Sequence, residues 1–95
     1  YIERLGFGVV RDLAGHGVGH ELHESPEVPN FGKPGSGEKL VPGMVLAIEP
    51  MVTIGDWEVM VAPDEWSIMT EDGSKAAHVE DMIVVTPTGY EMLTR

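Results

Sequence analysis

Glycine and proline punctuate this chain so often that no apolar run is long. The 95 residues contain 12 glycines and 7 prolines, and both are dense between Ser25 and Gly43. Because such clusters mark turns and loops, this stretch is expected to be one long loop. The apolar runs outside it are short and rich in β-branched residues, which is typical of strands joined by turns.

The apolar runs predict a set of consecutive strands. Their ranges are Phe7–Leu13, Met44–Thr53, Glu58–Val61, Trp66–Thr70, Ala76–Thr86 and Tyr90–Thr94. Short turns between most of them favour antiparallel pairing. The first residues are typical of the last turn of a helix that stops at Gly6. Because residue 1 is tyrosine, we expect a piece of a longer protein, with residues 1–95 forming a single domain.

Composition excludes several classes of partner and site. Sixteen acidic residues and six basic ones give a net charge of -10. This argues against nucleic acid and anionic membranes, which both need a basic surface. No apolar run approaches the roughly 20 residues of a membrane-spanning helix. The absence of cysteine excludes disulfides and thiolate metal sites, and fits a reducing, cytoplasmic setting.

Three of the four histidines, His16, His20 and His23, lie in a glycine-rich stretch. The glycines disfavour a helix, so irregular structure is expected. They also permit close backbone approach and positive φ, so that an imidazole can be aimed into a cleft. Imidazole binds divalent metals and serves as a general acid or base near neutral pH. The alternative is that these are hydrogen-bonded loop residues, and the His20–His23 spacing is one residue short of the zinc-protease HExxH motif.

Two acids interrupt apolar runs: Glu49 lies within Met44–Thr53, and Glu80 lies within Ala76–Thr86. A buried carboxylate must be paired, protonated or bound to a metal. Asp81 points away from Glu80 in a strand, and periodicity does not decide which of them faces a site. Alternatively, both strands are half-exposed and the acids face solvent. Together with a histidine, two such carboxylates would suit Mn, Fe, Co or Zn, including a bridged metal pair.

Six motifs follow one another along the chain: Gly15–Gly19, Leu22–Pro29, Leu40–Met44, Ile48–Met51, Asp64–Ser67 and Val79–Asp81. In this order and at these spacings, they resemble the C-terminal half of type I methionine aminopeptidases. The similarity extends from about Gly6 to Thr94. It implies the C-terminal half of a pita-bread fold of the α+β class, in which a curved antiparallel sheet carries a flanking helix.

The resemblance also implies a centre of two divalent metal ions (Co, Mn, Fe or Zn). His16 and Glu49 would be metal ligands, and Glu80 would bridge the two ions. Familiar bacterial members often carry histidine after the bridging glutamate, where this chain has Asp81, but that position is not a ligand. The two remaining ligands of the family are aspartates of the N-terminal half, so the metal site in this chain would be incomplete.

The same resemblance assigns substrate roles. His23 would be catalytic and would bind substrate by hydrogen bonding to the scissile peptide and its oxyanion, while Leu22 and Trp66 would line the pocket for methionine. His20 lies outside the pattern. The implied reaction is removal of the N-terminal methionine from nascent peptides by metal-assisted hydrolysis, with the missing N-terminal half as partner and little activity without it. The alternatives are a proline-specific pita-bread metallopeptidase and a non-catalytic pita-bread domain that binds peptides or proteins.

Overall fold

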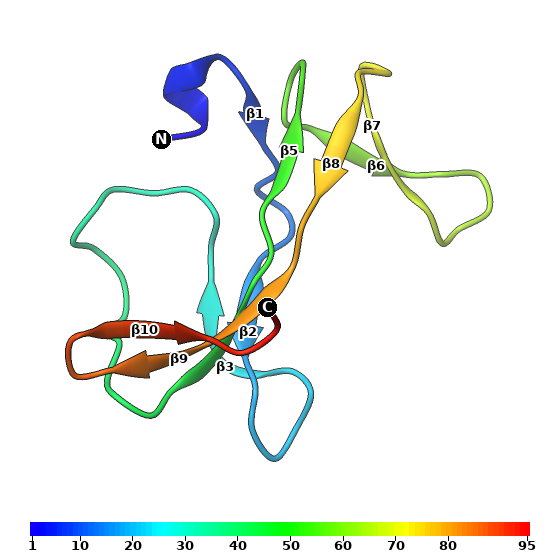
Figure 1. Cartoon of the computed structure of the whole chain (residues 1–95). Helices are drawn as coiled ribbons and strands as arrows, with labels where there is room; N and C mark the ends of the chain where they lie inside the picture. The colour runs from blue at the N-terminus through cyan, green and yellow to red at the C-terminus, as the bar shows by residue number, and fades with distance from the viewer.

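The computed structural model describes residues 1–95 as short β-strands and one turn of 3₁₀ helix (Figure 1). The elements are η1 (Glu3–Leu5), β1 (Gly8–Val9), β2 (Gly15–Gly17), β3 (Glu24–Val28), β4 (Val45–Ile48), β5 (Met51–Thr53), β6 (Val59–Val61), β7 (Ile68–Thr70), β8 (Ala76–His78), β9 (Asp81–Thr86) and β10 (Gly89–Met92).

All strand pairs are antiparallel, as predicted. A five-stranded sheet has the order β10-β9-β4-β2-β3, and a three-stranded sheet has the order β1-β5-β8. The hairpin of β6 and β7 stands apart as a two-stranded sheet (Figure 1). The two larger sheets are linked by the chain itself, because β4 leads into β5 and β8 leads into β9.

The expected flanking helix is absent, and the chain is all-β rather than α+β. The helical turn expected at the start is the single 3₁₀ turn η1, which Gly6 ends with a φ of 90°. The structure contains no helix that is long and apolar enough to cross a membrane. Glycine and proline explain the absence of longer helices, since both are unfavourable in helix interiors.

Both long predicted strands are interrupted. The run from Met44 to Thr53 divides into β4 and β5 at Glu49–Pro50, and the run from Ala76 to Thr86 divides into β8 and β9 at Val79–Glu80. Pro50 has no N–H to donate to a ladder, so pairing stops there on both strands. The four other predicted strands are shorter or shifted, and are observed as β1, β6, β7 and β10.

The glycine-histidine stretch and the start of the predicted loop are more ordered than expected. Residues Gly15–Gly17 form β2, and Glu24–Val28 form β3, although β3 contains Pro26. The sheet order places β3 at an edge. An edge strand tolerates proline where the missing N–H would have faced solvent. The long loop therefore begins after Val28.

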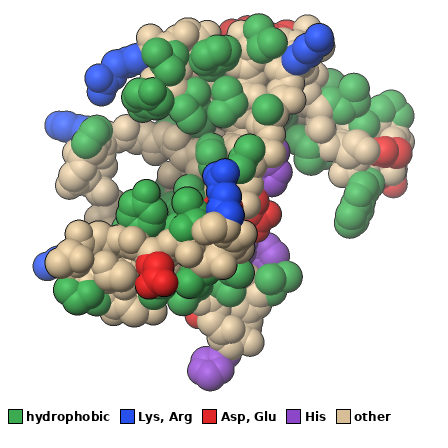
Figure 2. Space-filling model, viewed as in Figure 1, with side chains coloured by type: hydrophobic (Ala, Val, Ile, Leu, Met, Phe, Trp, Pro, Cys, Tyr) green, Lys and Arg blue, Asp and Glu red, His purple; other side chains and the backbone are tan.

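The hydrophobic core is small. Only nine of the 95 residues are buried, and the largest fully buried side chains are Leu46, Val9 and Thr53. Many large apolar side chains remain exposed, and Figure 2 shows them over much of one face. The sheets of this chain therefore leave a large apolar surface exposed.

Candidate metal centre

Strand register places the side chains of His16, Ala47 and Met82 on one face of the five-stranded sheet. His16 of β2 pairs with Ala47 of β4, and Ala47 pairs with Met82 of β9. Directly paired residues of antiparallel strands project to the same side. Ala47 is buried and small, so it leaves the imidazole of His16 free to extend across β4.

The breaks between β4 and β5 and between β8 and β9 place Glu49 and Glu80 opposite each other. Ile48 pairs with Asp81 on one side of the gap, and Met51 pairs with His78 on the other. Counting inwards from either side sets Glu49 opposite Glu80. Each lies two residues from a residue on the His16 face, Ala47 or Met82, so strand alternation turns both toward His16.

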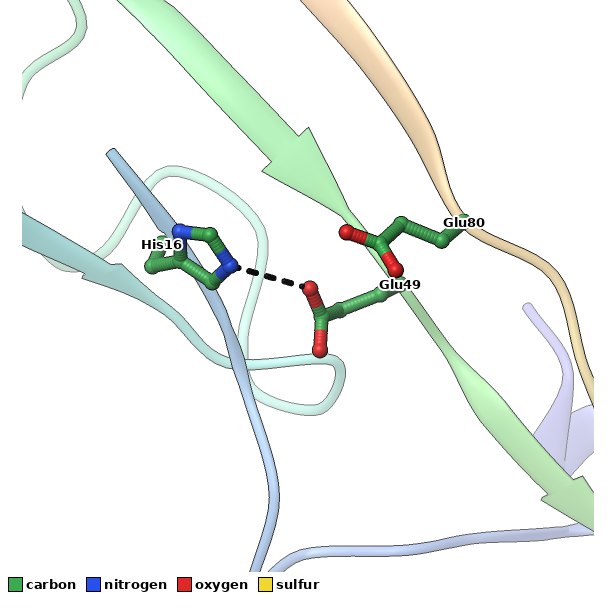
Figure 3. A group of neighbouring side chains, drawn as sticks. All are labelled: His16, Glu49 and Glu80. Carbon is green, nitrogen blue, oxygen red and sulfur yellow. Dashed lines mark ion pairs between the residues drawn. The ribbon is translucent and has the colours of Figure 1, made fainter. Parts of the chain in front are cut away.

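The side chains of His16, Glu49 and Glu80 converge (Figure 3). One potential ligand atom from each lies within 4.8 Å of the others. His16 Nε2 lies 3.2 Å from Glu49 Oε2, with side chains 13% and 16% exposed, whereas Glu80 is exposed. The predicted proximity of these residues is confirmed.

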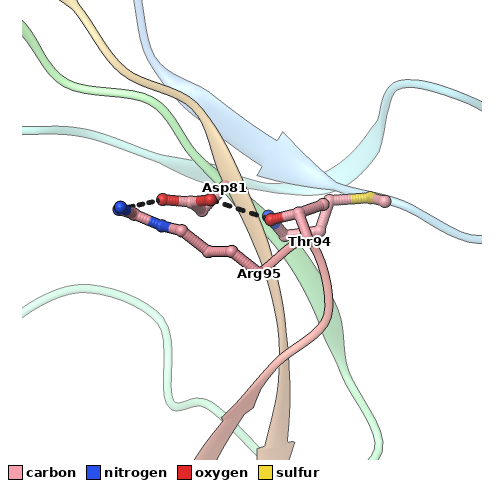
Figure 4. Close-up of polar contacts among 4 residues, drawn as sticks. Asp81, Thr94 and Arg95 are labelled. Atoms are coloured by element: carbon pink, nitrogen blue, oxygen red, sulfur yellow. Dashed lines mark hydrogen bonds and ion pairs between the residues drawn. The ribbon is translucent and has the colours of Figure 1, made fainter.

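Asp81 does not join this group. Its carboxylate accepts hydrogen bonds from the hydroxyl of Thr94 and the guanidinium of Arg95 (Figure 4). The hydrogen bond from Arg95, followed by the hydrogen bond from the Thr94 hydroxyl and then the charge of Arg95, lowers the pKa of the Asp81 carboxyl. The structure thus resolves which of the adjacent acids faces His16, and it is Glu80.

Close backbone packing explains the glycines on either side of His16. A Cβ on Gly15 would lie 2.2 Å from the carbonyl oxygen of Ala47, and one on Gly17 would lie 2.1 Å from that of Ser25. Neither glycine has positive φ. The expectation of close approach is therefore confirmed, but the expectation of positive φ is wrong at these two positions.

A backbone hydrogen bond orients the imidazole of His16. Its Nδ1 lies 3.0 Å from the carbonyl oxygen of Gly17, which accepts but does not donate, so Nδ1 carries the proton. In the neutral tautomer with the proton on Nδ1, the lone pair of Nε2 is turned toward Glu49. Metal-binding histidines typically donate their other N–H to a carbonyl or carboxylate in this way.

The charges at the site also fit a cation. Carboxylates directly opposite each other on paired strands repel, and here His16 is the only imidazole in the group. One imidazole nitrogen with carboxylate oxygens is a donor set suited to Mn, Fe, Co or Zn. The residues present therefore fit a divalent metal ion.

His23 lies beside the cluster rather than in it. Its ring centroid is 4.0 Å from that of His16, with 36° between the ring planes. The two rings border a hollow of about 440 Å³ that is also lined by Glu24 and Glu27. Glu27 pairs directly with His16 across β2 and β3 and was not predicted as a site residue. His20 is exposed.

The two residues expected at the methionine pocket are both highly exposed. Leu22 is 73% exposed and Trp66 is 87% exposed, and neither lines the hollow beside His16. The turn that carries Trp66 is ordered by Asp64, which accepts hydrogen bonds from the backbone N–H groups of Trp66 and Ser67. Their role at the pocket stays a prediction.

Comparison with known proteins places these features in a family. The model of metallopeptidase family M24 matches residues 1–87. The chain is 55% identical to a methionine aminopeptidase of Clostridium acetobutylicum, covering 99% of this chain and 38% of that protein. It is 52% identical to methionine aminopeptidase 1 of Bacillus subtilis, covering 100% and 38% respectively. The chain thus spans about 38% of the length of these relatives.

Solved structures agree with this assignment. The crystal structure of a methionine aminopeptidase from Thermotoga maritima matches with a TM-score of 0.94 and 55% identity, over 99% of this chain and 38% of that one. The enzyme from Rickettsia prowazekii matches with a TM-score of 0.94 and 38% identity, over 100% and 39%. The strands described above therefore form part of the pita-bread fold, and the chain belongs to metallopeptidase family M24.

Proposed function

We propose that this chain is the C-terminal, metal-binding part of a methionine aminopeptidase, which removes the N-terminal methionine from peptides and nascent proteins by hydrolysis. The observation that carries the proposal is the convergence of His16, Glu49 and Glu80 on one sheet face. It is supported by the similarity of nearly the whole chain to methionine aminopeptidases.

His16 Nε2 and the carboxylates of Glu49 and Glu80 would hold the metal, with Glu80 shared between two ions. Divalent ions at such a site supply Lewis acidity for hydrolysis of the peptide bond. The Gly17 carbonyl accepts a hydrogen bond from Nδ1 of His16 and so orients the ring with Nε2 toward Glu49. The chain's own contribution is therefore an oriented imidazole nitrogen beside two carboxylates.

His23 would act on the substrate rather than on the metal. Its ring packs beside His16 at the border of the hollow, where an N–H can reach a bound carbonyl. A donor placed there stabilises the oxyanion that develops during hydrolysis. Leu22 and Trp66, both exposed, would contact the methionine side chain once the rest of the pocket is present.

We further propose that the remaining ligands and the rest of the pocket come from the N-terminal half of the same domain. The chain spans about 38% of its relatives, and its exposed apolar side chains offer a surface for a second half. The donor set suits Co, Mn, Fe or Zn.

Reconstitution tests the proposal. The chain is mixed with a separately produced N-terminal half of the Thermotoga maritima relative in excess Mn²⁺ or Co²⁺, and release of methionine from a Met-Ala-Ser peptide is followed. The proposal expects release that is lost in His16→Ala and retained in His20→Ala, the exposed control. Cleavage of an X-Pro dipeptide in place of Met-Ala-Ser would indicate a proline-directed enzyme. Peptide binding without cleavage of either substrate would indicate a non-catalytic domain.

A further inference from the structure

Thr94 and Arg95 bind the side chain of Asp81, the residue that follows Glu80. Arg95 Nη2 donates to Asp81 Oδ2 at 2.5 Å, and the Thr94 hydroxyl donates to Asp81 Oδ1 at 2.8 Å (Figure 4). Asp81 is the first residue of β9, so both contacts act where the strand begins.

Thr94 also binds the backbone of β9. Its hydroxyl oxygen accepts the N–H of Met82 at 3.1 Å, while the N–H of Leu93 donates to the Met82 carbonyl at 2.8 Å. Regular pairing of β9 with β10 ends at Met92 opposite Ile83. Leu93 and Thr94 therefore extend the pairing of β9 toward Glu80. The Thr94 hydroxyl takes the place that a backbone carbonyl would have in the ladder.

This contact lies at the edge of the interruption. Asp81 pairs with Ile48, the last residue of β4, and the next pair inwards is Glu49 with Glu80, where ladder pairing has stopped. Glu80 itself belongs to no strand and is exposed. Asp81 is the nearest paired residue on the β9 side, so its position sets where the backbone of Glu80 lies.

The contact also separates the two adjacent acids. Asp81 and Arg95 line a hollow with Ile83 and Met92, whereas the group that faces His16 contains Glu80. A change of one residue in strand phase would exchange these faces and present Asp81 to the site. The ion pair with Arg95 opposes that change because it occupies the Asp81 carboxylate on the other face.

We propose that Thr94 and Arg95 are positioning residues, which hold Asp81 so that Glu80 points at His16 and Glu49. This inference rests on the proposed function, because it treats Glu80 as a metal ligand. Partners that orient metal ligands typically change metal affinity by about 10–100-fold when removed. Neither residue touches the metal or the substrate in this proposal.

The test substitutions change Thr94 in the chain reconstituted with the separately produced N-terminal half. Thr94→Val removes both hydroxyl contacts at similar volume, and Thr94→Ser keeps them. Thr86→Val, at the opposite end of β9, is the matched control. The readouts are amide exchange of Met82 by NMR, the nuclear Overhauser contact between the side chains of Glu80 and His16, and Mn²⁺ affinity from paramagnetic broadening.

Thr94→Val is expected to speed Met82 exchange, remove the contact between Glu80 and His16, and weaken Mn²⁺ binding by at least about tenfold. Thr94→Ser and Thr86→Val should resemble the parent chain in all three. Unchanged Met82 exchange in Thr94→Val would overturn the proposal, because the hydroxyl contact would then be absent. Faster exchange with an unchanged Glu80–His16 contact would overturn it too, because Thr94 would then stabilise β9 without aiming Glu80.

The metal-free readouts separate this inference from the proposed function. If the parent chain binds no Mn²⁺ even beside its N-terminal half, the metal function fails. The contact between Glu80 and His16 still decides in that case whether Thr94 positions the glutamate. Arg95→Met, which removes the ion pair, should show the same direction of change as Thr94→Val.

Discussion

Glu49 and Glu80 lie opposite each other across a gap in an antiparallel ladder whose register is the same on both sides. The gap matters because a continuous ladder would fix both side chains at ordinary strand positions. Instead, each glutamate occupies a short unpaired segment, and one oxygen of each lies within 4.8 Å of the other and of a His16 nitrogen. The fold therefore concentrates negative charge at one point, which a bound cation would relieve.

Removing one of these charges should have opposite effects on stability and on metal binding. Glu80→Gln is expected to stabilise the metal-free chain slightly, by less than about 1 kcal/mol, because it relieves repulsion between opposed carboxylates. The same variant should lose most of its Mn²⁺ affinity. Urea unfolding and Mn²⁺ titration measure the two effects, with Glu91→Gln on the exposed face of β10 as control. Retention of full affinity by Glu80→Gln would show that Glu80 is not a ligand.

The glycine after His16 should be intolerant of any side chain. A Cβ at Gly17 would meet the Ser25 carbonyl oxygen at 2.1 Å, so β2 and β3 would have to separate. Gly17→Ala is expected to lower the free energy of unfolding by about 1–3 kcal/mol, the usual scale of overpacking. At Gly19 the nearest atoms belong to the flexible Glu24 side chain, so Gly19→Ala is the control. Equal unfolding midpoints for both variants would contradict the predicted steric conflict.

Substitutions of the two neighbouring histidines, His16 and His23, should have different effects on metal content and on kcat. In the reconstituted enzyme, His23→Ala should lower kcat by about 10²-fold or more, the scale for loss of an oxyanion donor, with metal content unchanged. His16→Ala should lower metal content itself. Metal analysis of both dialysed variants, together with their kinetics, measures this difference. Equal metal loss would mean that His23 is a ligand and that its assigned role is wrong.

The turn between β6 and β7 should respond to acid. The hydroxyl of Ser67, followed by the backbone N–H groups of Ser67 and Trp66, lowers the pKa of the Asp64 carboxyl. A lowered pKa stabilises the turn above the unfolded-state value near 3.8, and this contribution is lost as the pH falls through the folded-state pKa. The NMR chemical shift of the Ser67 amide should stay constant between about pH 5 and 8 and change as the pH falls below about 4.

Asp64→Asn provides the comparison for that titration. It keeps an acceptor for the backbone N–H groups but removes the charge that titrates. Its Ser67 amide should therefore show a weaker acid transition than that of the parent chain. An identical transition in both proteins would assign the acid response to another carboxyl.

The convergence of the acids was predictable from sequence because a carboxylate within an apolar run is a strong signal. The geometry that achieves it was not, since periodicity treated residues 44–53 and 76–86 as continuous strands. Pro50 was the available sign of the break, because it cannot donate to a ladder. Periodicity alone could not choose Glu80 over Asp81, and the contacts of Asp81 with Thr94 and Arg95 span more than ten residues of sequence and leave no local pattern.

The prediction of a helix beside the sheet was wrong for a different reason. It was inferred from resemblance to a whole domain, whereas this chain spans about 38% of its relatives and supplies strands with one 3₁₀ turn. Strands within Ala14–Val28 were missed for a local reason. Glycine and proline usually indicate loops, but at Gly15 and Gly17 glycine permits close strand packing, and Pro26 lies in an edge strand.

The chain alone should neither turn over substrate nor stay monomeric. If His16, Glu49 and Glu80 are the ligands as proposed, they would leave two metal ions under-coordinated, and without the rest of the pocket little binding energy would remain to orient a peptide. The edge strand β8 and the apolar residues Val61, Ile68 and Met69 are exposed, which favours self-association. Sedimentation should show oligomers that dissociate when the N-terminal half is added, with methionine release appearing at the same time. Release from Met-Ala-Ser by the chain alone at about 1 per second or faster, a typical enzymatic rate, would show that its site is complete.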